Sequence, residues 1–320
     1  MDAVRHFRFV LDAAGNREAF SDHGTALVRL ERDVSAKCVS GGSQTFLLGR
    51  GRGRAMPVSA KGSAAFAALT NVPMKPHEHD IMRSVEESYW WYQALRRHVV
   101  DSIRPQPETF SVLDAGCGSG GMLAKLRREF PRADLTGIDA SEHAIELCRE
   151  RNTGAQLLRA GVHELPFSAG AFDVVLSLDV WVNAGVDDAL AAHETHRVLR
   201  PGGKLILNLA AFDFLRGAHD EAVGAVRRYT RPQVRALLEG AGFAVERLTY
   251  WNATLTPPIA LVRWLSRRQL AQGEARSDFR PLPPFLNAAL AGLAALELTA
   301  SRHLSLPFGT SVFAVARKHG

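Results

Sequence analysis

The sequence predicts an α/β fold, in which a parallel sheet is connected by crossover helices. Three observations support this: short apolar runs alternate with helical patterns between residues 110 and 251, the first run ends in a glycine-rich turn, and residues that begin or end helices stand between the runs. The chain has 320 residues, 46% of them hydrophobic and 22% charged. That length and composition suit a globular protein with a large buried core.

The expected elements follow in regular order. Six strands are predicted at 109–114, 133–139, 155–160, 172–179, 201–210 and 243–251. Helices are expected after Ser119, after Ser141 as N-cap, from Asp187 or Asp188, and after Thr230; Ser, Thr and Asp are residues that cap helix N-termini. Gln233 gives Thr230 the spacing of a capping box. A last strand is expected at 311–317.

Four parts of the chain are distinguished. Residues 1–73 are rich in Gly, Ser and Arg and show no sustained period, so we expect a disordered leader or upstream sequence from an early start; a basic arm that binds nucleic acid or membrane is the alternative. Residues 76–108 are expected to form an N-terminal helical cap. The core is predicted at 109–251 plus 309–318, and a helical insertion at 252–308 is expected to form half of a substrate pocket.

Charge and cysteine content exclude few partners. The net charge of +6 suits an acidic partner or a membrane surface, but it is spread along the chain, and we expect no nucleic acid partner. Cys38, Cys117 and Cys148 lack metal or redox spacing, which favours a reducing cytoplasm. The apolar segment 285–300 is shorter than the roughly 20 residues of a membrane span, so we expect a packed helix there.

The stretch VLDAGCGSGG, residues 112–121, joins the first strand to the next helix. Gly116, Gly118 and Gly121 have the G-x-G-x-x-G spacing that fits a dinucleotide, whose pyrophosphate sits on a helix N-terminus. Asp114 favours another ligand, because an ionised carboxylate repels a pyrophosphate and attracts an ammonium group such as that of S-adenosylmethionine. Asp139, which ends the second strand, suits ribose hydroxyls in either case.

Five motifs in sequence order resemble those of class I S-adenosylmethionine-dependent methyltransferases. They are VLDAGCGSG, GIDAS, HELPF, FDVVLSLDV and HRVLRPGGKLIL, between residues 110 and 209. The resemblance implies methyl transfer and a Rossmann-like sheet of seven strands with the last one antiparallel. VEESYWWYQALRR, HDEAVGAVRRYT, YWNATLTPP and LPFGTSVFAVARK are similar to a bacterial small-molecule subgroup of these enzymes.

The resemblance also implies where S-adenosylmethionine binds. Asp114, Gly116 and Gly118 would surround its amino acid tail, Asp139 would hold the ribose and Ala140 would flank the adenine. The full set of cofactor candidates is Asp114, Gly116, Cys117, Gly118, Asp139, Ala140, Val162, His163 and Asp179. One departure concerns Gly161, because the family often has an acidic residue there that contacts the adenine amino group. We expect weaker or differently arranged adenine recognition.

Candidate catalytic residues follow from the chemistry. Methyl transfer is an in-line displacement, so alignment contributes much of the rate, and a base is needed only where the acceptor must lose a proton. The subgroup commonly carries His at the positions of Asn183 and Ala225, which leaves a base at those places in doubt. The catalytic candidates are His219, Asp220 and Tyr229. A solvated surface histidine is the alternative for His219, and for Asp179 a cofactor contact or a strand cap is favoured over catalysis.

Residues 89–92, YWWY, form the densest aromatic cluster. On one helix these residues cannot all face one side, so part should cover a pocket and part should pack in the core. The substrate candidates are Tyr89, Trp91, Tyr92 and Arg228, with a solvated basic pair as the alternative for the arginine. HEHD (77–80) and HETH (193–196) lack the H-E-x-x-H spacing, so no metal is expected.

The sequence therefore favours S-adenosylmethionine-dependent methyl transfer to a small-molecule or lipid-like acceptor, held between the aromatic helix and the insertion. Peripheral contact with a membrane is kept beside pocket packing as a reason for the apolar insertion. Two rivals remain: an NAD(P)-dependent oxidoreductase that uses the same glycine loop, and a non-catalytic module that binds S-adenosylmethionine.

Overall fold

The computed structural model describes residues 76–104, 106–266, 282–301 and 304–319, and the backbone of six strands before them. The chain forms two compact units, Met1–Asn71 and Val72–Gly320. In the first, β1 (Arg8–Leu11), β2 (Arg17–Phe20) and β3 (Ala26–Leu30) form one antiparallel sheet, and β4 (Lys37–Gly41), β5 (Gln44–Leu48) and β6 (Met56–Val58) form another. The sequence pattern indicated no sustained strand period here, and the leader assignment stays a prediction.

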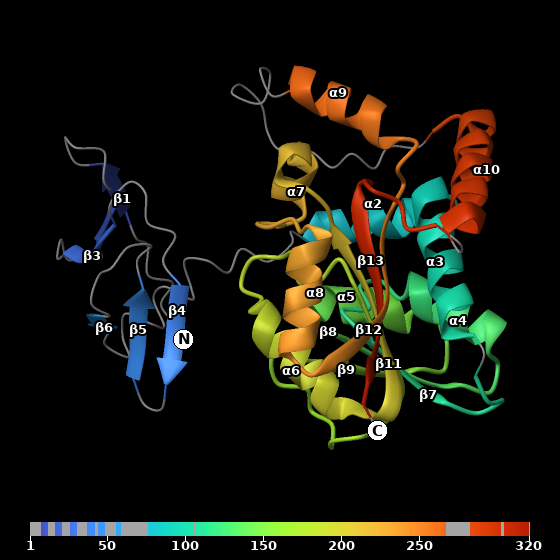
Figure 1. Cartoon of the computed structure of the whole chain (residues 1–320), viewed down its shortest axis with the longest axis horizontal. Helices are drawn as coiled ribbons and strands as arrows, with labels where there is room; N and C mark the ends of the chain where they lie inside the picture. The colour runs from blue at the N-terminus through green and yellow to red at the C-terminus, as the bar shows by residue number, and fades with distance from the viewer. Residues whose placement is uncertain are drawn as a thin grey trace. The chain divides into compact units, whose positions relative to one another are not determined.

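The second unit is built on a seven-stranded sheet (Figure 1). Its strands are β7 (Ser111–Ala115), β8 (Asp134–Asp139), β9 (Gln156–Arg159), β10 (Phe172–Leu178), β11 (Leu199–Ala210), β12 (Phe243–Trp251) and β13 (Ser311–Lys318). Their order is β12-β13-β11-β10-β7-β8-β9. β13 runs antiparallel to β11 and β12, whereas β7 to β11 pair in parallel. The predicted sheet with an antiparallel last strand is confirmed.

Helices connect and cover these strands. They are α2 (Pro76–Val85), α3 (Trp90–Ile103), α4 (Gly121–Glu129), α5 (Glu142–Arg149), α6 (Asp188–Val198), α7 (Ala218–Ala222), α8 (Arg231–Gly240), α9 (Thr256–Ser266) and α10 (Pro284–Ser301), with the short 3-10 helix η1 (Asp213–Leu215). The predicted caps form: Ser141 accepts from the amide of Ala144, Asp187 accepts from that of Leu190, and Thr230 makes a capping box. The expected insertion between β12 and β13 contains α9 and α10.

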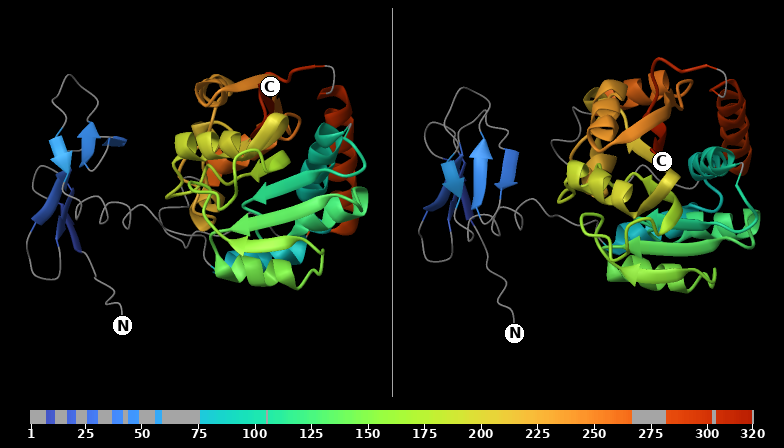
Figure 2. Two further views of the ribbon diagram at one scale, coloured as in Figure 1. Left: turned by 90° about the horizontal axis from the view of Figure 1, so that it is seen from below. Right: turned by 60° about the horizontal axis from the view of Figure 1, so that its bottom comes forward.

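The sheet has a core on each face, because successive residues of a strand point to opposite sides. On β10, Val175 belongs to one core, while Val174 and Leu176 belong to the other. α6 and α8 cover the first face, and α3, α4 and α10 cover the second (Figure 2). The parallel strands end at one edge of the sheet, where α2, α7 and α9 also lie (Figure 1). Function is therefore sought at that edge.

Candidate functional site

The glycine loop after β7 is held tightly against the end of β8. The amides of Gly116 and Cys117 both donate to the carbonyl of Ile138 at 2.8 Å. Gly116 has a φ of +99°, and a Cβ there would overlap the side chain of Val180, so this position requires glycine. Gly118 has a φ of +52° and open space where a Cβ would stand. The loop thus presents bare backbone beside free space.

Asp139 lies directly beside this loop. Its carboxylate accepts hydrogen bonds from the amide of Gly118 at 3.0 Å and from that of Ser141 at 2.9 Å. These bonds fix the carboxylate at the junction of β8 and the loop. Because the amide of Gly118 already donates to this carboxylate, a negatively charged pyrophosphate is disfavoured at that amide.

Asp114 is the buried acid of the site, with a relative exposure of 2%. Its Oδ2 has no hydrogen-bond partner among the described residues. Burial, followed by the charges of Asp139 and Glu86, raises the pKa of Asp114 to about 7. Three carboxyl groups therefore converge on the loop, and a cationic ligand would relieve their repulsion.

Glu86 joins the N-terminal cap to the loop, a contact that the sequence analysis missed. Its carboxylate accepts from the hydroxyl of Ser119 and from the guanidinium of Arg151, and Arg96 lies 3.8 Å from it. A Cβ on Gly121 would overlap this carboxylate, so the third glycine of the motif makes room for the cap. The only sequence signal was an acidic pair beside the aromatic cluster.

Asp179 follows β10 in a left-handed backbone conformation, with a φ of +58°. Its carboxylate accepts from the amide nitrogen of the Asn208 side chain at 2.7 Å, and burial raises its pKa to about 7. Trp251 donates to the other end of Asn208 at 2.8 Å, and Trp91 stacks on Trp251 with ring centroids 5.6 Å apart. The aromatic helix and Asp179 thus belong to one connected cluster.

The aromatic cluster packs largely against the core, and its role in covering a substrate stays a prediction. Trp90 is buried in the core. Tyr89 lies at the edge of this core, and its ring centroid is 6.1 Å from that of Trp90. The Tyr92 hydroxyl is buried, and burial followed by the charges of Glu86 and Asp179 raises its pKa. Tyr92 therefore lies within the field of the acidic groups at the carboxyl edge.

Asp220 and Arg228 form a buried ion pair, so Arg228 is not a solvated surface residue, and the catalytic and substrate roles of the two residues stay predictions. Arg228 donates to both oxygens of Asp220, at 2.8 and 3.0 Å, and to the carbonyl of Ala211 at 2.8 Å. Burial alone would raise the pKa of Asp220, but the hydrogen bonds from Arg228 bring it below its ordinary value. Both side chains hold the loop after β11. His219 lies beside them on α7, and its catalytic role stays a prediction.

Tyr229 is also used within the fold. Its hydroxyl donates to Asp188 at 2.7 Å and contacts the carbonyl of Trp181 at 3.2 Å. Burial, with the charge of Asp188, raises the pKa of Tyr229 above its ordinary value. A tyrosine held protonated is a poor base, which argues against the catalytic role that the sequence suggested for Tyr229. Asn183 and Ala225 lie opposite each other in an isolated bridge.

The part of the site that is predicted to hold the adenine includes the turn after β9. Val162 is buried, and His163 accepts from the amide of Asp187 at 2.7 Å, which fixes the start of α6. The carbonyl of Ala140 accepts from Arg159 at 3.2 Å. Gly161 is exposed, and nothing lies within 4 Å of a Cβ built there. An acidic side chain would therefore fit at Gly161 without displacing a neighbour.

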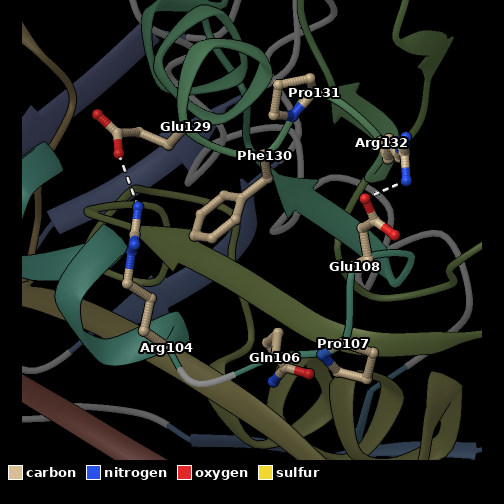
Figure 3. Close-up of a pocket in the computed structure, with 8 residues that line it drawn as sticks. All are labelled: Arg104, Gln106, Pro107, Glu108, Glu129, Phe130, Pro131 and Arg132. Atoms are coloured by element: carbon tan, nitrogen blue, oxygen red, sulfur yellow. Dashed lines mark hydrogen bonds and ion pairs between the residues drawn. The ribbon is translucent and has the colours of Figure 1, made fainter.

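Two surface hollows lie away from these residues. The first, shown in Figure 3, has a volume of about 530 Å³ and is bordered by Arg104, Gln106, Pro107, Glu108, Glu129, Phe130, Pro131 and Arg132. Arg104 pairs with Glu129 at 2.9 Å, and Arg132 pairs with Glu108. The second lies between α3, α10 and the sheet. Neither contains a predicted site residue, so the carboxyl edge remains the candidate site.

Comparison with known proteins gives matches across the core. Residues 113–207 match the family described as a methyltransferase domain. The chain is 28% identical over 202 residues to a malonyl-[acyl-carrier protein] O-methyltransferase of Enterobacter lignolyticus, covering 58% of this chain and 78% of that protein. It is 37% identical over 94 residues to a fatty-acid O-methyltransferase of Mycolicibacterium smegmatis, covering 29% of this chain and 34% of that protein.

A likeness to a solved structure supports the fold. The methyltransferase in complex with the Trm112 methyltransferase activator of Haloferax volcanii superposes with a TM-score of 0.51 at 18% identity. The match covers 80% of this chain and 97% of that one. The same arrangement of sheet and helices is therefore found in an experimental structure.

Proposed function

We propose that this chain, a class I S-adenosylmethionine-dependent methyltransferase by its fold and by the family of residues 113–207, methylates a carboxyl group of a small or lipid-like acceptor. The observation that carries the proposal is the convergence of Asp114, Asp139 and Glu86 on the glycine loop. Such a loop repels a pyrophosphate and favours the ammonium and sulfonium groups of S-adenosylmethionine. This charge pattern argues against the NAD(P)-dependent rival.

The residues present fit this cofactor. Asp114 has an unpartnered buried oxygen that can accept from an ammonium group, and Asp139 is fixed where it can accept from ribose hydroxyls. The backbone of Val162 could contact the adenine, beside the open position at Gly161. When bound, S-adenosylmethionine supplies a methyl group that is activated by the sulfonium charge.

A carboxylate acceptor would not need a general base. A carboxylate is already ionised at neutral pH, so it can attack the methyl carbon without prior proton removal. The carbon–sulfur bond breaks as the carbon–oxygen bond forms, and its electron pair stays on sulfur. The chain then needs only to align the reactants and exclude water. Tyr229 and Asp220 are engaged elsewhere, and Asn183 and Ala225 lack basic side chains.

The comparisons support an acyl acceptor. One relative is named for malonyl groups on acyl-carrier protein and another for fatty acids. Trp91 and Tyr92, which are half-buried, would give the acyl chain an aromatic wall, with the buried Trp251 stacked behind Trp91. We further propose a cytoplasmic enzyme that meets a membrane peripherally, and we expect no nucleic acid partner.

The test is incubation of the purified full chain with methyl-labelled S-adenosylmethionine and a set of fatty acids, dicarboxylic acids and their thioesters. Mass spectrometry of extracted products should show label in methyl esters, and the Asp114→Asn variant should show much less. Label found only in alcohols or amines would overturn the carboxylate assignment. Absence of S-adenosylmethionine binding would overturn the whole proposal.

A further inference from the structure

The helix α10 presents a long uncharged face to solvent. By length and composition it is the helix among the described residues that could cross a membrane, yet only 22% of its apolar window is buried. Phe285 and Leu296 are 77% and 72% exposed, and Leu286 and Leu293 are also exposed. The sequence predicts a packed helix here; the helix is present, but it packs along only a narrow stripe.

Two polar side chains of α10, those of Asn287 and Glu297, are directed into the fold. The Glu297 carboxylate accepts from the amides of Ala253 and Thr254, both at 2.9 Å. The Asn287 side chain accepts from the amide of Trp90 at 2.9 Å and donates to the carbonyl of Ser88 at 2.8 Å. No charged residue remains on the exposed side of this helix. These bonds fix the helix lengthwise on the protein, so it lies on a surface instead of spanning a bilayer.

A second group of exposed apolar side chains lies on α9 and η1. Leu261 and Val262 of α9 are 57% and 61% exposed, and Phe214 of η1 is 56% exposed. α9 and α10 both lie toward the carboxyl edge, where the cofactor residues gather (Figure 1). We call the exposed residues of α9 and α10 the apolar rim. An acceptor reaching the site from this side would pass over the apolar rim.

We infer that the apolar rim rests in the interface of an anionic lipid bilayer, an inference that rests on the proposed lipid-like acceptor because the bilayer would hold it. Charge favours this occupant. The stretch between α9 and α10, residues 267–281, carries Arg267, Arg268, Arg276 and Arg280 against Glu274 and Asp278. Basic residues that follow an exposed apolar helix in the sequence favour anionic lipids over neutral ones.

The test is flotation of the full chain with vesicles of phosphatidylcholine alone or mixed with phosphatidylglycerol. The wild type should float with the mixed vesicles and much less with the neutral ones. A Phe285→Gln/Leu296→Gln double variant should partition at least about tenfold more weakly, because two exposed apolar side chains no longer enter the interface. The matched control is Leu190→Gln on α6, 52% exposed and far from α10, which should float like the wild type.

Each outcome has a defined meaning. S-adenosylhomocysteine binding, measured in parallel, should be unchanged in the double variant and so reports correct folding. If the wild type ignores both kinds of vesicle, or if the double variant floats equally well, the inference is overturned. Loss of dimers in the double variant, seen by ultracentrifugation, would assign the rim to a second copy. Vesicle binding without methylation of any acid would overturn the proposed function but would support the inference that the apolar rim binds lipid.

Discussion

Replacing Asp114 by Asn removes one charge from the end of β7 while keeping the size of the side chain. Burial, together with Asp139 and Glu86, raises the pKa of Asp114 from 3.8 to about 7. Between these values the folded protein binds more protons at this site than the unfolded chain does. The free energy of unfolding of the ligand-free protein should therefore fall as pH rises through this window.

The size of the effect follows from the pKa. A rise of about 3 units corresponds to roughly 4 kcal/mol, at about 1.4 kcal/mol per unit, so the wild type should lose up to that much stability across the window. The Asp114→Asn variant should not lose this stability as the pH rises. Asp179, whose pKa is also raised to about 7, is present in both proteins and cancels in the comparison.

The same carboxylate should control cofactor binding. S-adenosylhomocysteine carries the ammonium group, so its affinity for the wild type should rise with pH up to about 7. The variant should bind about tenfold to a hundredfold more weakly above that pH, the range expected for loss of a charge-assisted hydrogen bond. Chemical denaturation and calorimetric titration on both sides of pH 7 measure both effects. Identical pH dependence and affinity in the two proteins would refute the reasoning.

Three further predictions concern other parts of the site. Gly161→Asp should strengthen S-adenosylmethionine binding about fivefold by adding one hydrogen bond to the adenine amino group, as calorimetry would show. Glu86→Gln should cost about 3–5 kcal/mol of unfolding free energy in denaturant melts, because Arg96 and Arg151 lose a buried partner. Tyr229→Phe should leave the pH profile of methyl transfer unchanged, because this hydroxyl stays protonated.

Each of these predictions has its own control or counter-result. Gly240→Asp places an acid at another open glycine, on α8, and should not change cofactor affinity; an equal gain there would point to a general charge effect. Glu87→Gln, at a side chain 45% exposed, should cost far less stability than Glu86→Gln. A shifted acid limb in the Tyr229→Phe profile would return this residue to the catalytic candidates.

Local patterns predicted most of the core. Strands were visible as apolar runs, and the caps at Ser141, Asp187 and Thr230 were readable because a cap depends on residues three positions apart. Asp114 and Asp139 were found because parallel strands end at a common edge, so the residue ending each run is placed by topology alone.

The features that the sequence did not reveal depend on tertiary contacts. Glu86 lies 33 residues from Ser119 and 65 from Arg151, so no local pattern reveals their network. Arg228 was given a substrate or surface role because arginine is rarely fully buried, yet Asp220 neutralises it inside the fold.

The packing of α10 was misjudged for a different reason. Its sequence is apolar all round, so the pattern contains no polar stripe to mark which side faces solvent. Only the inward bonds of Asn287 and Glu297 identify the packed side.

The most direct test of the account is calorimetric titration of the full chain with S-adenosylhomocysteine and, separately, with NADH. The three carboxyl groups at the glycine loop predict binding of S-adenosylhomocysteine with no heat from NADH. Binding of NADH in place of S-adenosylhomocysteine would contradict the account.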